Sequence, residues 1–239
     1  MLDIIDIDRW GGEMCQHDTV LAPCARPYQP HARATLGHGH VCAVLSPSRE
    51  IKVFAEGAEL FAFRGAAWHL LDLESKYQVW AEAVGDTALA GRLFQTALDL
   101  ADAREGALFV VLRDPETVSQ LVAAPDRLDI PVADGHADHQ SPSRRDLLHL
   151  LEGRRATDLD ASVFAGVAAI DGATVVDRRG KLLAAGAILR LPPSDMQNSE
   201  LIEGARTTAA LGASRFGPVL KVSEDGIITF FDGERVWDI

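Results

Sequence analysis

The chain has 239 residues, of which 47% are hydrophobic and 24% are charged, which is enough for one large domain or two small ones with a sizeable core. Its 35 acidic residues against 23 lysines and arginines give a formal charge of −12. A surface this acidic repels phosphate backbones, so we expect no binding to nucleic acid. The charge is compatible with a small nucleotide, because one local cluster and metal ions can hold its phosphates.

The sequence also bears on the compartment. No apolar run reaches the roughly 20 residues that span a bilayer, and the first ten residues carry three acids and no basic residue before Arg9. We therefore expect no membrane segment, no secretory signal and a cytoplasmic location. The three cysteines are an odd number and are expected to be reduced.

Residues 1–84 are predicted to form a small β-rich region with a sensor or accessory role. Residues 18–37 contain several prolines among polar residues and are expected to be a loop. From His40 to about Asp72, short runs of strand-forming residues alternate with Ser-Pro-Ser and Gly turns, which predicts a β-meander. Such a sheet has to cover its apolar face with another element.

Residues 85–239 are predicted to form a second domain. Apolar residues at three-to-four spacing predict a helix over 85–104, and Asp86 with Thr87 supplies a start signal. The run ALFVVL at 107–112 is apolar on both faces, which is typical of a strand in the middle of a sheet covered by helices.

The elements after residue 112 complete the predicted fold. They are a loop-rich stretch at 115–145, a short helix at 145–151, strands at 163–170, 173–177 and 181–191, a helix at 199–214 and three closing strands. The fold class that follows is α/β, with a mixed central β-sheet flanked by helices and preceded by the small β-rich region.

Three short stretches of the second half hold the candidate site. They are Asp171-Gly172-Ala173, the run GARTTAA at 204–210, and Val222-Ser223-Glu224. Taken singly, an Asp-Gly between β-type runs is first of all a hairpin turn, and an arginine in a helix is usually a solvated charge. Taken together they supply carboxylates for a metal ion, a guanidinium for phosphate and glycines for close approach, which phosphoryl transfer requires.

From residue 85 onward, the order and spacing of these stretches resemble those of the diadenylate cyclase family, whose motifs read D-G-A, G-T-R-H-R-x-A and V-S-E. The apolar strands around the motifs match as well. The resemblance implies condensation of two ATP into cyclic di-AMP with release of pyrophosphate. It also implies that each protomer binds one ATP and that two protomers of a homo-oligomer meet face to face.

The family's roles, carried onto this chain, make Asp171, Arg206 and Glu224 catalytic. Asp171 and Glu224 would hold a Mg²⁺ or Mn²⁺ ion, and Arg206 would contact phosphate. The residues that the resemblance implies in nucleotide binding are Gly172, Ala173, Gly204, Thr207, Thr208 and Ser223.

One motif departs from the family pattern, because Thr207 and Thr208 stand where it has His and Arg. Losing a charged contact to phosphate commonly costs on the order of a hundredfold in rate. Lys221, Arg215 and Arg190 are candidates to supply the missing charge. Three hypotheses stay open: a diadenylate cyclase, a degenerate module that senses an adenine nucleotide without turnover, and a structural α/β protein.

A second cluster, near the amino end, contains residue types that bind zinc. Its members are Cys15, His17, Cys24, His31, His38, His40 and Cys42. The sequence has no Cys-x-x-Cys pair and no His-Glu-x-x-His motif, so we do not expect a zinc site. A Ser-His-Asp hydrolase is weaker still, since Gly-x-Ser-x-Gly is absent.

Overall fold

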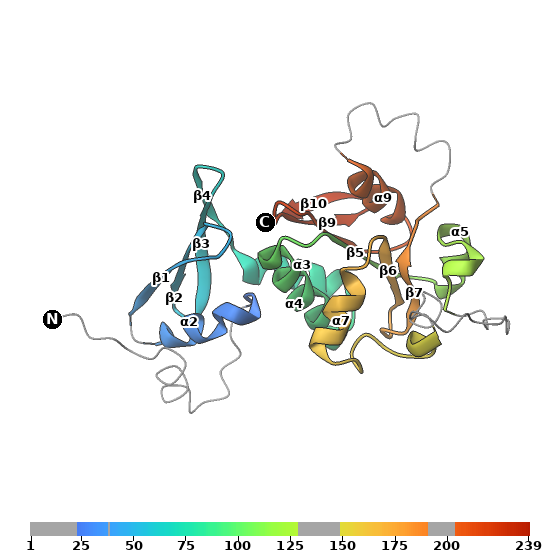
Figure 1. Cartoon of the computed structure of the whole chain (residues 1–239), viewed down its shortest axis with the longest axis horizontal. Coiled ribbons are helices and arrows are strands. Elements are labelled where there is room, and N and C mark those ends of the chain that lie inside the picture. The colour runs from blue at the N-terminus through green and yellow to red at the C-terminus, as the bar shows by residue number, and fades with distance from the viewer. Residues whose placement is uncertain (1–22, 38, 129–148, 191–203) are drawn as a thin grey trace, which may run out of the picture. The chain divides into compact units, whose positions relative to one another are not determined.

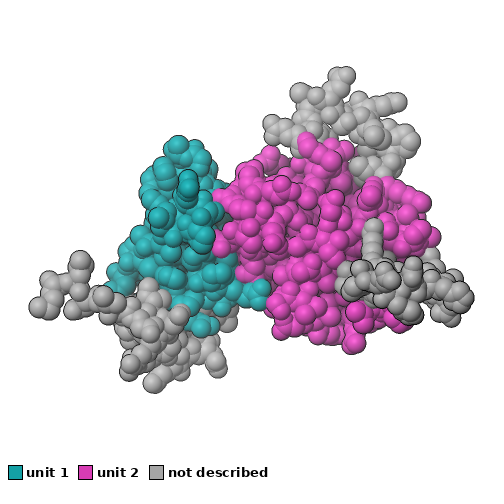
Figure 2. Space-filling view, viewed as in Figure 1, with its two compact units in different colours: residues 1–79, 239 teal, residues 80–238 magenta. Residues whose placement is uncertain are grey.

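The computed structural model describes residues 23–37, 39–128, 149–190 and 204–239 (Figure 1). The chain divides into two compact units, coloured separately in Figure 2: unit 1 is Met1–Val79 with Ile239, and unit 2 is Trp80–Asp238. The sequence placed the division after residue 84. The division after Val79 falls within helix α3 (Leu73–Val84), which was not predicted, and residue 84 is the last residue of this helix.

Unit 1 contains a four-stranded antiparallel sheet in the order β1-β2-β3-β4, so the predicted meander is confirmed. The strands are β1 (Val41–Leu45), β2 (Ile51–Ala55), β3 (Ala58–Arg64) and β4 (Ala67–Leu70). Successive strands pair with their neighbours along the chain, as short polar turns require.

The predicted loop at 18–37 is wrong in its second half. A 3₁₀ turn, η1 (Arg26–Tyr28), leads into helix α2 (Gln29–Ala34). Pro27 and Pro30 lie within the first two positions of these elements, where a backbone N–H has no partner in the helix. Prolines that suggested a loop therefore start helices here.

Helix α2 covers one face of the unit 1 sheet. Phe54 of β2 is fully buried, with the rings of Tyr28 and His31 at centroid distances of 5.9 and 6.1 Å. The Lys52 ammonium lies 4.9 Å from the centre of the Tyr28 ring and 3.2 Å from Glu59 Oε1. This face therefore includes a buried ion pair beneath the helix.

Unit 2 is built on a six-stranded sheet in the order β10-β9-β8-β5-β6-β7. The strands are β5 (Ala107–Leu112), β6 (Ala173–Asp177), β7 (Leu182–Ala187), β8 (Val219–Val222), β9 (Ile228–Asp232) and β10 (Glu234–Asp238). The β5–β6 pair is parallel and the other pairs are antiparallel. β5 is buried along its whole length, which confirms the predicted central strand and the mixed α/β fold class.

Helices pack against both faces of this sheet. They are α4 (Thr87–Ala103), α5 (Val118–Leu121), α7 (Ala161–Ala168) and α9 (Ala205–Ala213), with 3₁₀ turns η2 (Pro115–Thr117) and η3 (Ala124–Asp126). Neighbouring residues of β5 show the two faces: Phe109 contacts Phe164 of α7, whereas Leu108 packs in a cluster with Ala210 of α9. Figure 1 shows α9 and α7 on opposite sides of the strands.

Helix α4 confirms the helix predicted over 85–104. The Asp86 side chain accepts a hydrogen bond of 2.9 Å from the Leu89 amide, so the predicted start signal is a true N-cap. The helix predicted at 145–151 and the start of the one predicted at 199–214 fall largely outside the described residues. In the part of the chain that the structure describes, no helix combines the length and hydropathy needed to cross a membrane.

The strand predicted at 163–170 is wrong, because α7 occupies this segment. Asp160 accepts a 2.8 Å hydrogen bond from the Ser162 amide and starts the helix. Its buried residues, Phe164, Val167 and Ala168, follow the three-to-four spacing of a helix, which an unbroken apolar run conceals. Asp171 and Gly172 therefore connect a helix to β6, and the hairpin-turn interpretation of these two residues is also wrong.

Candidate functional site

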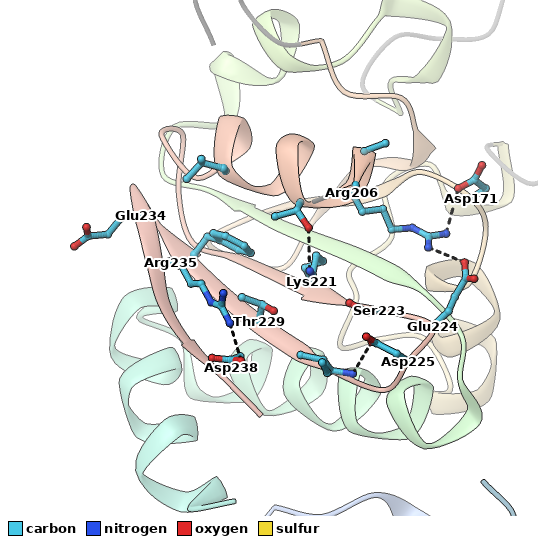
Figure 3. A pocket seen from close by; sticks show the side chains of 16 residues that line it. Asp171, Arg206, Lys221, Ser223, Glu224, Asp225, Thr229, Glu234, Arg235 and Asp238 are labelled. Carbon is cyan, nitrogen blue, oxygen red and sulfur yellow. Dashed lines mark hydrogen bonds and ion pairs between the residues drawn. The ribbon is translucent and has the colours of Figure 1, made fainter. Parts of the chain in front are cut away.

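A large pocket lies in unit 2 where the start of α9 faces strands β8, β9 and β10 (Figure 3). Its volume is about 1220 Å³. The residues that line it are Asp171, Gly204, Ala205, Arg206, Thr207, Leu211, Lys221, Ser223, Glu224, Asp225, Ile227, Thr229, Phe231, Glu234, Arg235 and Asp238. The pocket therefore contains all three residues predicted to be catalytic.

Arg206 connects the two predicted metal-binding carboxylates at one end of this pocket. Its Nη1 lies 2.8 Å from Glu224 Oε1 and its Nη2 lies 3.5 Å from Asp171 Oδ1. The three side chains come from the first turn of α9, the turn after β8 and the link between α7 and β6 (Figure 3). Asp171 is 97% exposed and Glu224 is 70% exposed, so both carboxylates are accessible to a ligand.

The first turn of α9 presents backbone amides to the same space. Gly204 precedes the helix with φ of +85°, and the helix bond from the Thr208 amide to the Gly204 carbonyl follows at 3.2 Å. Among the described residues, no side chain caps this end, and no acidic residue lies in the first turn. A helix N-terminus without such a cap offers hydrogen-bond donors and partial positive charge to an anion.

A tight turn after β8 positions Ser223 and Glu224. The Ser223 amide donates to the Ile227 carbonyl at 2.9 Å, and the Gly226 amide donates to the Ser223 carbonyl at 3.0 Å. Gly226 has φ of +82°, and a β-carbon there would lie 2.5 Å from Arg104 Nη1. The guanidinium of Arg104 therefore packs against the turn that carries Glu224.

Gly172 fixes the position from which Asp171 projects. Its φ is +114°, and a β-carbon would lie 2.4 Å from the carbonyl carbon of Gly186 in β7. The glycine is thus required by the close approach of two backbones, independently of any ligand. With Gly172 packed on β7, Asp171 extends into solvent.

Three residues predicted to bind nucleotide do not line the pocket. Ala173 is 1% exposed within β6, and Gly172 packs closely against the backbone of β7. The Thr208 hydroxyl donates to the Gly204 carbonyl at 3.3 Å within its own helix. Their contact with a nucleotide stays a prediction. Gly204, Thr207 and Ser223, in contrast, line the pocket with the catalytic candidates.

Lys221 supplies a positive charge beside Thr207. Its Nζ lies 3.1 Å from Thr207 Oγ1, and the side chain is half-buried on the pocket floor. Of the three cations that the sequence offered in place of the missing charge, this one lines the pocket, whereas Arg215 and Arg190 do not.

Gly106 is a site residue that the sequence did not indicate. A β-carbon at this position would lie 2.3 Å from Nη1 of Arg206 and 2.6 Å from its Cζ. The guanidinium therefore rests on the backbone just before β5. A glycine directly ahead of a buried strand was the available signal, but sequence alone does not tell which side chain uses the space.

The far end of the pocket is formed by the edge strand. Thr229 of β9 pairs with Lys221 on one side and Asp238 of β10 on the other. Arg235 Nη2 lies 2.7 Å from Asp238 Oδ2. Charged and polar side chains thus continue along the sheet from Lys221 to β10 (Figure 3).

The described cysteines and histidines of the amino-terminal cluster lie before η1, in α2 and at or just before β1. His31 stacks among Tyr28 and Phe54, Cys24 is buried, and burial raises the pKa of the Cys42 thiol. Over the described ranges, no three His, Cys, Asp or Glu side chains gather as a metal site. The members Cys15, His17 and His38 lie outside the described residues.

Comparison with known proteins gives distant likenesses. No protein-family model matches the chain, and no curated protein matches it. A solved structure of a hypothetical membrane spanning protein from Bacillus cereus is 21% identical with a TM-score of 0.48, covering 69% of this chain and 70% of that one. DacA from Staphylococcus aureus, solved as a double mutant, is 24% identical with a TM-score of 0.36, covering 63% and 86%. At such values neither protein's properties extend to this chain.

Proposed function

We propose that the pocket binds the triphosphate of ATP and that the chain is a diadenylate cyclase-like nucleotidyltransferase, which condenses two ATP into cyclic di-AMP. The observation that carries the proposal is Arg206 held between Asp171 and Glu224 at 3.5 and 2.8 Å. These are the three residues that the motif resemblance implied as catalytic. Their convergence from distant parts of the chain supports a shared chemical role.

The two carboxylates suit a Mg²⁺ or Mn²⁺ ion. Asp171 and Glu224 both reach one guanidinium and are both exposed, so a cation that displaces this guanidinium would find a carboxylate on either side. Mg²⁺ is usually held by one or two carboxylates together with substrate phosphates and water. When bound, the ion would neutralise charge on the phosphates, and Arg206 would be released from its carboxylates to contact a phosphate oxygen.

The remaining groups of the pocket have roles in the same reaction. Lys221, Thr207 and the first amides of α9 would hold phosphate oxygens. The 3′-oxygen of each ATP would form a bond to the α-phosphorus of the other, each bond to pyrophosphate would break, and Asp171 of each protomer would take the hydroxyl proton. Because each pocket holds one nucleotide, the reaction requires two protomers that face each other.

A second candidate function is a sensor that binds an adenine nucleotide without turnover. It is favoured by Thr207 and Thr208, which hydrogen-bond to Lys221 and to the Gly204 carbonyl and bring no charge of their own. Lys221 then supplies binding energy, while the transition state has fewer cations around it than the motif of the resembling family provides.

Incubation of the full chain with ATP and Mn²⁺, followed by chromatography for cyclic di-AMP, tests the proposal. Asp171→Asn should abolish the product, while Glu116→Gln, an exposed acid outside the pocket, should leave it unchanged. If no product forms but ATP raises the melting temperature of the wild-type chain, the sensor stands and the cyclase fails. If ATP changes neither, both nucleotide functions fail.

A further inference from the structure

One face of the unit 1 sheet carries apolar side chains only. Residues opposite each other in an antiparallel pair project from the same face, so the strand register identifies the set. This set, the apolar face, consists of Val41, Ala43 and Leu45 of β1, Ile51, Val53 and Ala55 of β2, Ala58, Phe61 and Phe63 of β3, and Trp68 and Leu70 of β4. It extends across all four strands.

The large side chains of the apolar face are exposed. Their exposed fractions are 68% for Val41, 71% for Leu45, 40% for Phe61, 57% for Trp68 and 67% for Leu70. With roughly 150–250 Å² for each aromatic side chain and about 100 Å² for each Val or Leu, these five alone present on the order of 400 Å² of apolar surface. That lies within the range of the largest patch on a typical soluble monomer, about 300–600 Å², and such patches are often functional.

The opposite face of the same sheet is built differently. There α2 covers Phe54, and the charged pair Lys52–Glu59 lies buried beneath it. The face with a covering helix thus carries the charges, whereas the face without one among the described elements carries none. The uncovered face of such a sheet is buried when a further apolar layer of similar size packs against it.

We propose that the apolar face joins two copies of this chain, sheet against sheet, in a two-fold symmetric dimer. The area fits, because a standard interface buries about 800 Å² on each partner, and the smaller residues of the face add to the five large ones. A two-fold axis needs a patch that complements itself, and a uniformly apolar sheet face does so without matched charges.

The charges within the apolar face are compatible with a second copy. The chain carries a net charge of −12, so an anionic membrane would repel it, and a second copy would also repel it at long range. The apolar face has no charged member, and within it two copies bring no like charges into contact. The dimer does not depend on nucleotide binding in unit 2, although a reaction between two ATP molecules requires paired chains.

Sedimentation velocity of the full chain tests the dimer. We expect a wild-type dimer at micromolar concentration, and a dimer Kd raised at least about 100-fold in Leu45→Glu/Leu70→Glu, because association would bury unpaired charges. The matched control is Val163→Glu/Ile188→Glu, which changes two apolar side chains of unit 2 exposed by 52% and 75%. The control should dimerise like the wild type.

Several outcomes would overturn the proposal: a wild-type chain that stays monomeric at 100 μM, a glutamate variant that still dimerises, or a control that also dissociates. Flotation of a monomeric wild type with phosphatidylcholine vesicles would assign the face to lipid instead. If circular dichroism shows that the glutamate variant is unfolded, Leu45→Ser/Leu70→Ser serves in its place, with a weakening of at least about tenfold expected. ATP binding is measured on the same samples, so failure of the dimer is distinguished from failure of the nucleotide site.

Discussion

The six-stranded sheet of unit 2 has helices against both faces, whereas the four-stranded sheet of unit 1 has α2 against one face and exposed apolar side chains on the other. In unit 2 the polar groups of the candidate site gather at strand ends and at the start of α9. In unit 1 the notable surface is one whole face of a sheet. Unit 2 therefore carries its candidate site beside a sheet that helices cover on both faces. Unit 1 leaves an apolar sheet face exposed, which a partner would bury.

The ion pairs of the two units also differ in how exposed they are. Lys52–Glu59 in unit 1 is nearly inaccessible, with side chains 10% and 4% exposed, while Arg206 in unit 2 meets carboxylates that are mostly exposed. Buried pairs are costly to break because one charge is left without its partner, and exposed pairs contribute little to stability. The Lys52–Glu59 pair should therefore contribute to the stability of the fold, and Arg206 with its two carboxylates should contribute to ligand binding.

The largest expected effect comes from a matched pair of phenylalanines. Phe109→Ala removes a fully buried ring from β5 and should lower the free energy of unfolding by about 3–5 kcal/mol, because a cavity is left in the core. Phe61→Ala removes a 40% exposed ring of the apolar face and should cost less than about 1 kcal/mol in the monomer. Urea denaturation measures both, and equal losses would contradict the exposed position of Phe61 on the apolar face.

The ion pairs provide the next test. Glu59→Gln keeps the shape of the side chain but leaves Lys52 without its carboxylate, so the free energy of unfolding should fall by about 3 kcal/mol. Asp171→Asn should change it by less than about 0.5 kcal/mol, since that carboxylate is 97% exposed. Thermal and urea unfolding of the two variants provide the comparison. A strongly destabilised Asp171→Asn would mean that Asp171 serves the fold.

Substitution of two glycines next to the site should affect two different properties, stability at one position and ATP affinity at the other. At Gly172 an added methyl group meets the backbone of Gly186 at 2.4 Å with φ at +114°, so Gly172→Ala should cost about 2 kcal/mol of stability. At Gly106 the methyl group meets the movable end of Arg206, so Gly106→Ala should cost under about 1 kcal/mol but weaken ATP binding roughly tenfold. Urea denaturation and calorimetric titration with ATP separate the two. Unchanged ATP affinity in Gly106→Ala would exclude Arg206 as a phosphate contact.

Much of this architecture follows from sequence patterns. The four strands of unit 1, the capped helix α4 and the wholly apolar β5 were all predicted, because turn residues, an N-cap and an unbroken apolar run are local signals. Helix α7 was missed because a short apolar run fits a buried strand as well as a helix. Helix α2 was missed because its prolines suggested a loop, although they occupy first-turn positions.

In the candidate site, too, some features were predicted from the sequence and others were not. Motif order grouped Asp171, Arg206 and Glu224, and the structure places them in contact, while their catalytic roles stay predictions. The packing of Gly106 under Arg206 depends on the approach of α9 to the start of β5, about 100 positions apart along the chain. No local pattern encodes such an approach. The register that brings Lys221 beneath Thr207 is of the same kind.

Lys221 carries the smallest expected effect. Lys221→Met keeps the aliphatic stem and removes the charge, so stability should change by less than about 1 kcal/mol, because the ammonium is only half-buried beside Thr207. ATP affinity should fall about 5- to 10-fold, as expected for one charged contact to phosphate. The affinity of the variant should also depend less steeply on salt, since one attraction between a cation and the phosphates, which salt screens, has been removed. Arg215→Met, which changes an exposed cation outside the pocket, is the matched control. If both variants lose affinity equally, the nucleotide responds to net charge alone, and Lys221 has no specific place in the site.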